Sequence, residues 1–379
     1  MALTNKLTAI ADSIREKTGK TDLLTLDQMP VEIAAIETGG TELPDSAFEF
    51  GGSCNYMFYS SDWNWFIDMF GDKITTKDIT AAKFMFGYNS SLERVPFVLN
   101  FKSSEKSHDL GSMFQDAYGL KEVPRMSGCI ANNLSDMFNG CRNLREVPDW
   151  FVNQIDWSFT EAMTTYTAGG YVQNMFEDCY SLRKYPLELL KHPNPKGSYL
   201  YCYFYHMANN CYALDELVNI PLSGYNTSWS SNAFASCVTR ASRLKNFTFA
   251  LQEDGSPYVM KWKSQTIDLS NYVGYASDAA NITGYNSGIT ADKRVTDDAS
   301  YQALKNDPDW FTTSLDYSRY NHDSAVATIN SLPDTSAYGT NTIKFKGAAG
   351  AKTDGGAINT LTPEEIAVAT AKGWTVTLA

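Results

Sequence analysis

The sequence predicts an α/β fold: an elongated solenoid of short strands and helical turns, with a small helical segment at its N-terminus. Two observations lead to this prediction. The chain has 379 residues, more than the roughly 100–200 residues of one ordinary compact core. Its middle also repeats a short motif six times. Repeats that cannot bury their apolar faces alone bury them by stacking on their neighbours.

The repeated motif is built on a methionine–phenylalanine pair. Counting from the phenylalanine, the first four copies place leucine six residues on and proline ten residues on, and several copies have cysteine three residues on. An apolar residue also recurs three positions before the methionine. The copies are FMFGYNSSLERVP (84–96), SMFQDAYGLKEVP (112–124), DMFNGCRNLREVP (136–148), NMFEDCYSLRKYP (174–186), HMANNCYALDELV (206–218) and NAFASC (232–237).

The spacing of the copies predicts the structure of one unit. Phenylalanines 86, 114, 138 and 176 are 28, 24 and 38 residues apart, which suits a leucine-rich-type unit with insertions. We predict a short helical turn over the Met-Phe pair, a bend, and a brief strand such as LREV that ends at proline. Because residues 134, 137, 141 and 144 are also spaced as on one helix face, a wholly helical repeat is the alternative.

The region from 251 to 379 is predicted to contain diverged repeats and a C-terminal cap. Strands are indicated by alternating apolar and polar residues in FTFAL (247–251), QTIDLS (265–270), TIKFKG (342–347) and TVTLA (375–379). The last helix has Thr362 as N-cap, Pro363 at its first position, Glu365 to complete a capping box and Gly373 just past its end. We assign residues 41–250 to the regular repeats.

Residues 1–40 lack the repeat motif, and we predict that they form a helical attachment segment. Two short helices carry apolar stripes, at Leu7, Ile10 and Ile14 and at Met29, Ile33 and Ile36. Helices of this length are unstable alone, so the stripes must dock on another surface. The alternative is that the segment caps the solenoid.

The composition excludes several classes of protein. The net charge of −12 argues against binding to nucleic acid. No run approaches the roughly 20 apolar residues of a membrane-spanning helix, so we expect no membrane insertion. The charged N-terminus does not suit a signal peptide, which favours synthesis in a cytoplasm. The seven cysteines are then expected to be thiols that pack as small buried hydrophobic residues.

The repeat frame resembles the BspA-type leucine-rich repeat. The resemblance is good over 84–218 and weaker from 50 to about 250, with irregular insertions at 149–171 and 187–203. It implies a leucine-rich-repeat-like solenoid that serves as an adhesive or display scaffold.

The two ends of the chain also resemble a known group. The N-terminal LTNKLTAIADSIREKTGKTDLLTLDQMPVEIAAI and the C-terminal LTPEEIAVATAKGWTVTLA are similar to tail and receptor-binding proteins of phages and prophages of Gram-positive bacteria. The resemblance implies a virion tail or baseplate protein, made in the host cytoplasm. It would attach to other tail or baseplate proteins by its N-terminus and bind a host-surface glycan or protein, as a homotrimer.

Motifs of catalysis and metal binding are not found. The four histidines lack zinc-ligand spacing, and there is no C-x-x-C, phosphate loop or G-x-S-x-G. We therefore expect no metal, no cofactor and no enzymatic activity. Two alternatives stay open: a bacterial cell-surface leucine-rich-repeat adhesin, and a polysaccharide depolymerase that would need only two suitably spaced carboxylates.

Aromatic residues are the candidate ligand contacts. In YLYCYFYH (199–206) an extended chain would place Tyr199, Tyr201, Tyr203 and Tyr205 on one face. Tyrosine offers a broad amphipathic contact at low entropic cost. Trp150, Trp157, Tyr166 and Trp229 are further candidates. The alternative is that Phe204 and Met207 pack inward as in any repeat, and that each tryptophan belongs to the core.

Overall fold

The computed structural model describes residues 47–159, 172–192, 204–225, 233–270, 320–345 and 361–378, apart from positions 235, 240, 242 and 243. Isolated residues at 11, 12, 15, 317, 318, 352 and 353 are also described. The apolar stripes expected in the attachment segment, Leu7, Ile10, Ile14, Met29, Ile33 and Ile36, lie outside the described residues.

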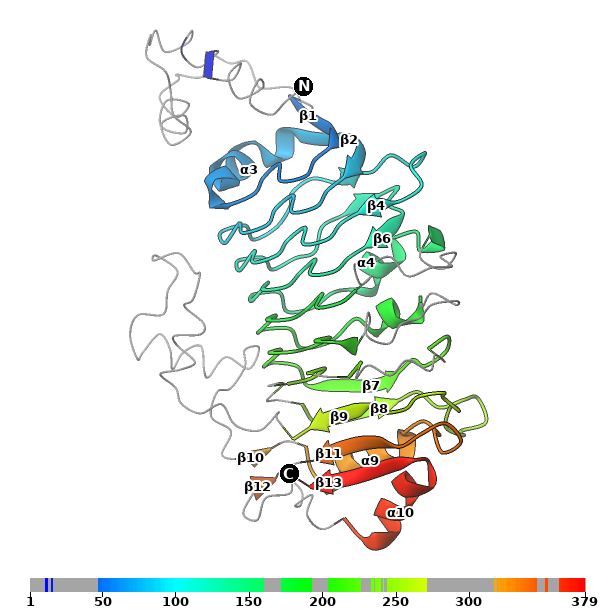
Figure 1. The fold of residues 1–379 in the computed structure, drawn as a ribbon. Helices are drawn as coiled ribbons and strands as arrows, with labels where there is room; N and C mark the ends of the chain where they lie inside the picture. The colour runs from blue at the N-terminus through cyan, green and yellow to red at the C-terminus, as the bar shows by residue number, and fades with distance from the viewer. Residues whose placement is uncertain are drawn as a thin grey trace.

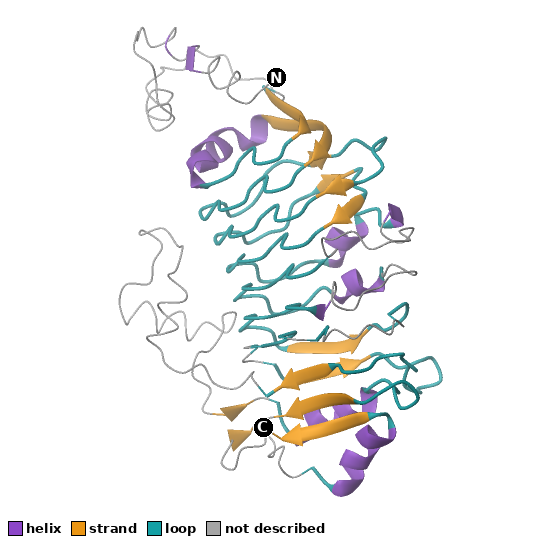
Figure 2. Ribbon diagram, viewed as in Figure 1, coloured by secondary structure: helices purple, strands orange, loops and turns teal. Residues whose placement is uncertain are grey.

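The described chain forms an elongated stack of coils, each lying beside the next (Figure 1). Every strand pair in the described ranges is parallel and joins one coil to another. Figure 2 shows the strands of the first coils along one flank and turns along the other. The paired strands are β1 (Phe48–Ser53) with β2 (Ile74–Ala81), β3 (Leu99–Asn100) with β5 (Met126–Ser127), β4 (His108–Asp109) with β6 (Ala131–Asn133), β7 (Glu216–Ile220) with β8 (Asn246–Phe249), and β10 (Tyr317–Ser318) with β12 (Lys352–Thr353).

Short helices flank the stack. They are the 3₁₀ helices η1 (Ser61–Trp63), η2 (Gly71–Lys73) and η3 (Leu187–Lys191) and the α-helices α3 (Asn64–Phe70) and α4 (Asp149–Asn153). Helix α3 buries Phe66, Ile67 and Phe70 against the first coils. Helices α4 and η3 each start directly after a proline, Pro148 and Pro186, whose missing N–H is no loss at a helix start.

The C-terminal part matches its predicted elements. The predicted strands are present as β8 and as β9 (Thr266–Leu269), β11 (Asn341–Phe345) and β13 (Trp374–Leu378). The last three form a parallel sheet in the order β13-β11-β9, accompanied by α9 (His322–Ser331) and α10 (Pro363–Ala371). The predicted start of α10 is confirmed, because Thr362 and Glu365 cap each other's backbone N–H groups.

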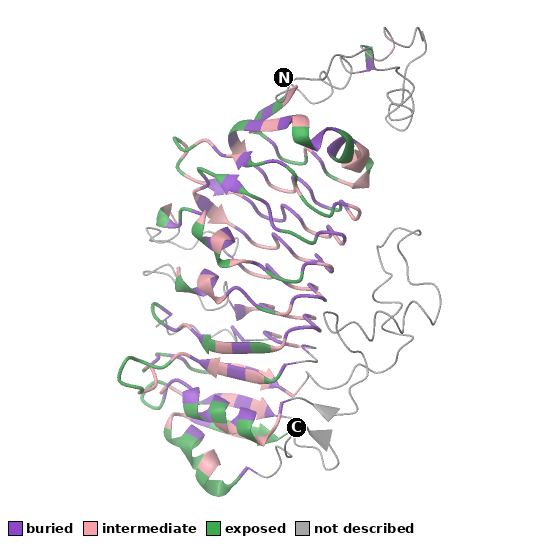
Figure 3. Ribbon diagram, turned by 180° about the vertical axis from the view of Figure 1, so that it is seen from behind, coloured by how far each residue is buried: buried purple, intermediate pink, exposed green. Residues whose placement is uncertain are grey.

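The core is a set of aligned columns of side chains. The rings of Phe58, Phe86, Phe114, Phe138 and Phe176 are all fully buried and stack with centroid separations of 5.4, 5.1, 5.6 and 5.7 Å. The leucine column is equally buried: Leu92, Leu120, Leu144, Leu182, Leu214 and Leu244. Figure 3 shows that buried residues recur in coil after coil. Phe58 belongs to a further copy of the motif, CNYMFYS (54–60), in addition to the six predicted from the sequence.

The helical turn predicted over the Met-Phe pair is wrong, and so is the wholly helical repeat. The residue before the methionine and the residue two after the phenylalanine adopt left-handed φ in successive coils. Between them, the phenylalanine N–H donates to the next coil, as from Phe86 to the Met113 carbonyl at 2.8 Å and from Phe114 to the Met137 carbonyl at 2.9 Å. These N–H groups therefore serve a ladder between coils and are not available for helical bonds.

The brief strand predicted before the proline is reduced to isolated bridges. Glu146 pairs with Lys184, and Lys184 pairs with Glu216. In the earlier coils regular pairing begins after the proline instead, at β3 and β5. Proline cannot donate to a ladder, so the coil bends there and pairing resumes beyond it.

The cysteines pack as predicted. The six described cysteines are all buried. The thiols of Cys141, Cys179 and Cys211 donate to the carbonyls of Phe114, Phe138 and Phe176 at 3.1–3.2 Å. Burial raises the pKa of Cys129 to about 12 and that of Cys237 to about 12, so both remain protonated at neutral pH.

Candidate functional site

The Met-Phe turns of successive coils together form one side of the stack, which we call the turn face. Three positions recur on it: the residue before the methionine, the residue after the phenylalanine, and the next residue. Coil by coil they are Tyr56, Tyr59 and Ser60; Phe84, Gly87 and Tyr88; Ser112, Gln115 and Asp116; Asp136, Asn139 and Gly140; Asn174, Glu177 and Asp178; and His206, Asn209 and Asn210. The chemistry changes along the stack from aromatic to mainly amide and carboxylate.

The first two coils bring four rings together, and we call Tyr56, Tyr59, Phe84 and Tyr88 the aromatic cluster. Tyr56 stacks on Phe84 with centroids 5.2 Å apart and an interplanar angle of 10°. Tyr59 contacts Tyr56 at 5.5 Å and Tyr88 at 5.3 Å. Even so, Tyr56, Tyr59 and Tyr88 keep 54%, 36% and 45% of their surface exposed. Exposed aromatic groups of this kind are typical of binding surfaces.

Gly87 makes room for the aromatic cluster. A Cβ at this position would lie 3.0 Å from the Phe84 ring and 3.4 Å from the Tyr59 ring, tighter than most side chains tolerate. The smallest residue in the motif therefore lies where the rings of two coils converge. The arrangement of the rings depends on this absence of a side chain.

The backbone does not favour aromatic residues at these positions. Tyr56, Phe84 and Tyr88 have φ of 58°, 53° and 58°, a left-handed region that Asn, Asp and Gly occupy more readily. Their N–H groups each donate to the next coil, to Lys83, Gly111 and Gln115, and this ladder holds the conformation. A bulky residue in this region costs on the order of 1 kcal/mol. Folding alone therefore does not explain why the rings are there.

The later coils fill the same positions with a hydrogen-bonded polar network. The Asp136 carboxylate accepts from Asn139 at 3.1 Å and from Asn174 at 3.2 Å. The Glu177 carboxylate accepts from Asn209 at 2.7 Å and lies 2.9 Å from the His206 ring nitrogen. Asn174 and Asn209 thus link neighbouring coils through these carboxylates, although the buried Oδ1 of Asn174 has no hydrogen-bond partner.

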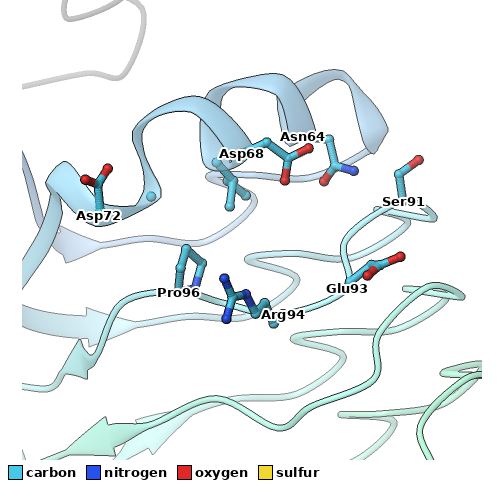
Figure 4. Close-up of a pocket in the computed structure, with 9 residues that line it drawn as sticks. Asn64, Asp68, Asp72, Ser91, Glu93, Arg94 and Pro96 are labelled. Carbon is cyan, nitrogen blue, oxygen red and sulfur yellow. The ribbon is translucent and has the colours of Figure 1, made fainter.

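A polar cavity lies beside the first coils (Figure 4). It has a volume of about 630 Å³ and lies between α3 and residues 91–96. Its labelled polar lining is Asn64, Asp68, Asp72, Ser91, Glu93 and Arg94. Glu93 is ion-paired with Lys121 at 3.0 Å. The cavity provides carboxylates of the kind that the depolymerase alternative requires.

Two of the tryptophans nominated from the sequence, Trp150 and Trp157, pack within the stack. Trp157 is buried, donates its indole N–H to the Val152 carbonyl at 3.1 Å and stacks on His192, so its assignment as a ligand contact is corrected. Trp150 is half-buried, with the Arg125 guanidinium 3.5 Å from its ring centre.

The predicted tyrosine face is only partly described. Tyr205 is half-buried and stacks on His206 at 3.9 Å. Phe204 and Met207 are buried, as the inward-packing alternative expected. Tyr199, Tyr201, Tyr203, Tyr166 and Trp229 lie outside the described residues.

The aromatic cluster escaped the sequence analysis for a definite reason. Its members are up to 32 residues apart, and two of them belong to the copy at 54–60 that was not recognised. Aligning the copy at 54–60 with the copy at 84–96 places Tyr56 at the position of Phe84 and Ser60 at the position of Tyr88. This alignment would have indicated that the aromatic side chains of the two coils lie close together. The signal was therefore present in the repeat register.

The described ranges contain neither a metal-binding cluster nor a membrane-spanning helix. No group of three or more histidine, cysteine or acidic side chains comes together there in a way that could hold a metal ion. In the same part of the chain, no helix combines the length and the apolar character needed to cross a bilayer.

Comparison with known proteins gave no matching family model, no similar curated protein and no similar solved structure.

Proposed function

We propose that this chain is a receptor-binding or adhesion protein of a phage or prophage tail or baseplate, and that its aromatic cluster contacts a host-surface glycan or protein. In this proposal the stack is an irregular leucine-rich-repeat-like solenoid without enzymatic activity. The N-terminal segment attaches it to other tail proteins, as a homotrimer. The resemblances in the repeats and at both chain ends support the assignment.

The single observation behind the proposed contact is the exposed aromatic cluster in backbone positions that favour polar residues. Tyr56 and Tyr88 remain about half exposed in left-handed conformations. Later coils place Asp136, Asn174 and Asp178 at equivalent positions. Residues that oppose the local backbone preference and remain exposed are typical of functional surfaces.

The test uses a variant that suits the fold but lacks the rings. Replacing Tyr56→Asn and Tyr88→Asn removes two exposed rings and provides residues that the left-handed conformation favours. We expect the melting temperature to stay the same or rise, and binding of the fluorescent full chain to Gram-positive cells to fall roughly tenfold or more. Tyr338→Asn is the matched control, because this tyrosine is similarly exposed but lies in the C-terminal part.

Pre-treating the cells separates the two kinds of receptor. Protease treatment abolishes binding to a protein, and removal of cell-wall glycan abolishes binding to a glycan. Undiminished binding by the double variant would contradict the assignment of the aromatic cluster. Absence of the chain from purified phage particles would favour the alternative of a bacterial cell-surface adhesin, and release of reducing sugar from cell walls would favour a depolymerase.

A further inference from the structure

The cavity between α3 and residues 91–96, which we call the α3 cavity, has two walls that are held together at two places. Gly71 lies so close to Pro96 that a Cβ on the glycine would be 2.3 Å from the proline ring. Near the start of α3, the Ser61 and Ser90 hydroxyls are 2.9 Å apart, and the Ser61 oxygen also accepts from the Ser90 N–H at 3.2 Å. The volume of about 630 Å³ is within the range of sites for small ligands.

Two of the four charged side chains that line the α3 cavity have ion-pair partners outside its lining. The Asp72 carboxylate lies 3.7 Å from the Lys73 ammonium group, and the Glu93 carboxylate lies 3.0 Å from that of Lys121. These two acids are therefore at least partly neutralised by the protein itself.

The other two, Asp68 and Arg94, have opposite charge and no partner. Within the part of the chain that the structure describes, neither side chain forms a hydrogen bond or an ion pair. Asp68 comes from α3 and Arg94 from the segment that forms the opposite wall (Figure 4). Both are exposed, so their charges are accessible from the solvent. The two groups line the same cavity but do not pair across it.

Other opposite charges on separate segments of the stack do make contact. The Arg183 guanidinium lies 3.5 Å from the Asp215 carboxylate, and the Lys344 ammonium lies 3.5 Å from that of Asp268. The unpaired anion and cation of the α3 cavity add no such contact to the fold. A ligand with one group of each sign could pair with both.

The neutral part of the lining suits amide groups. The Asn64 side-chain oxygen is enclosed without a hydrogen-bond partner, a state that a donor would relieve. Ser91 provides a hydroxyl on the opposite wall, near Asn64 (Figure 4). Ile67 and Pro96 supply apolar surface beside these polar groups. Amide and hydroxyl groups next to apolar surface match a peptide backbone with small side chains.

We propose that the α3 cavity binds a short zwitterionic peptide. The Arg94 guanidinium holds the free carboxylate of the peptide with two parallel hydrogen bonds, and the Asp68 carboxylate accepts from its free ammonium group. Asn64 and Ser91 bond to the peptide groups between the two ends. No residue of the aromatic cluster lines the cavity, so the proposal is independent of the receptor contact proposed above.

Trialanine is the probe, with two blocked forms as counterparts. N-acetyl-trialanine lacks the ammonium group, and trialanine amide lacks the carboxylate. Calorimetric titration of the full-length chain at about pH 6.5 keeps the free amine charged. A salt concentration of about 50 mM limits the screening of exposed charges. We expect trialanine to bind roughly fivefold or more tightly than either blocked form.

Two charge-removing variants should give a crossed pattern. Arg94→Gln should weaken trialanine and N-acetyl-trialanine roughly fivefold and leave trialanine amide within about twofold. Asp68→Asn should weaken trialanine and trialanine amide by a similar factor and leave N-acetyl-trialanine within about twofold. Lys77→Gln and Glu122→Gln are the matched controls, because these exposed residues lie outside the lining and should change none of the three affinities.

The same measurements can overturn the proposal. Equal affinity for the three peptides would do so, as would an equal loss for all three in either variant. No binding of trialanine up to about 10 mM would also overturn it. Both variants should melt within about 2 °C of the native chain, because neither side chain has a partner to lose. A fall of several degrees with unchanged peptide affinity would show that the residue serves the fold instead.

Discussion

The first two coils and the later coils of the turn face have the same backbone but different chemistry. In both, the residue before the methionine and the residue two after the phenylalanine are left-handed, and N–H groups at these positions, such as those of Tyr56 and Asp136, bond to the next coil. The later coils place Asp136 and Asn174 there, residues that suit this conformation. The first coils place Tyr56 and Phe84 there. The backbone therefore tolerates both, and the aromatic residues require a reason other than folding.

The two regions also differ in how far their side chains are exposed to solvent. Asp136 accepts a hydrogen bond from Asn174, and Glu177 accepts one from Asn209, in each case from the following coil. The rings of the aromatic cluster satisfy one another only in part, since Tyr56 keeps 54% of its surface exposed. The comparison suggests that the polar coils stabilise the stack and that the aromatic coils remain available for a partner.

The largest expected effect tests whether the column of stacked phenylalanine rings stabilises both regions equally. Phe138→Ala would open a cavity between two stacked rings under the polar coils, and should cost about 3–5 kcal/mol of unfolding free energy. Urea denaturation measures this loss. Phe58→Ala, beneath the aromatic coils, should lower the unfolding free energy by a similar amount. A loss below about 1 kcal/mol at Phe58 would show that the column of phenylalanine rings does not stabilise the two regions equally.

The next effect compares the two glycines of the turn face. Gly140 has φ +77°, and a Cβ there would lie 2.4 Å from the Asp116 carboxylate. Gly140→Ala should therefore destabilise the chain by about 1–3 kcal/mol. At Gly87 the φ is not left-handed, so Gly87→Ala should cost less while still displacing the Phe84 and Tyr59 rings. Chemical denaturation of the two variants side by side checks the order.

A third effect concerns the core under the aromatic coils. Asn89 occupies the position that Cys141, Cys179 and Cys211 occupy later, and both its side-chain polar atoms are buried without a hydrogen-bond partner. Asn89→Cys should stabilise the chain by about 1–2 kcal/mol, because it removes an unsatisfied buried amide. Thermal and urea unfolding test it. A loss of stability would mean that the amide has a role that the later coils lack.

The smallest effect is a pH dependence from His108 on the strand flank. Burial lowers the pKa of this imidazole, which accepts from the Ile130 N–H at 3.0 Å. The unfolded pKa is about 6.5, so the neutral ring contributes stability above that pH, and the contribution is lost as pH falls through the lower folded pKa. Urea midpoints at about pH 7.5 and about pH 5 should therefore differ more for the native chain than for His108→Gln. Equal differences would contradict this assignment.

Repeat register allowed the buried positions to be predicted well. The recurrent apolar positions Leu110, Leu134, Val172 and Phe204 are fully buried, and the capping box at Thr362 forms as its residues imply. Both follow from patterns in which residue type and spacing determine one arrangement.

Turn geometry could not be predicted in the same way. The spacing of Leu134, Met137, Cys141 and Leu144 suits a helix and a stacked turn alike, because periodicity does not reveal whether an N–H bonds within its coil or to the next. The aromatic cluster depends on the same register between coils. Its rings come from separate copies of the motif, so only their alignment could have indicated it.

The buried cysteines determine which redox conditions the described part of the chain tolerates. The six described cysteines are buried, and those at 141, 179 and 211 already donate to backbone carbonyls. Protonated, solvent-excluded sulfur reacts slowly with oxidants and with other thiols. We therefore expect these sulfurs to keep the same covalent state in reducing and in aerobic surroundings. The six described cysteines therefore require no oxidative maturation after the chain leaves the compartment in which it folds.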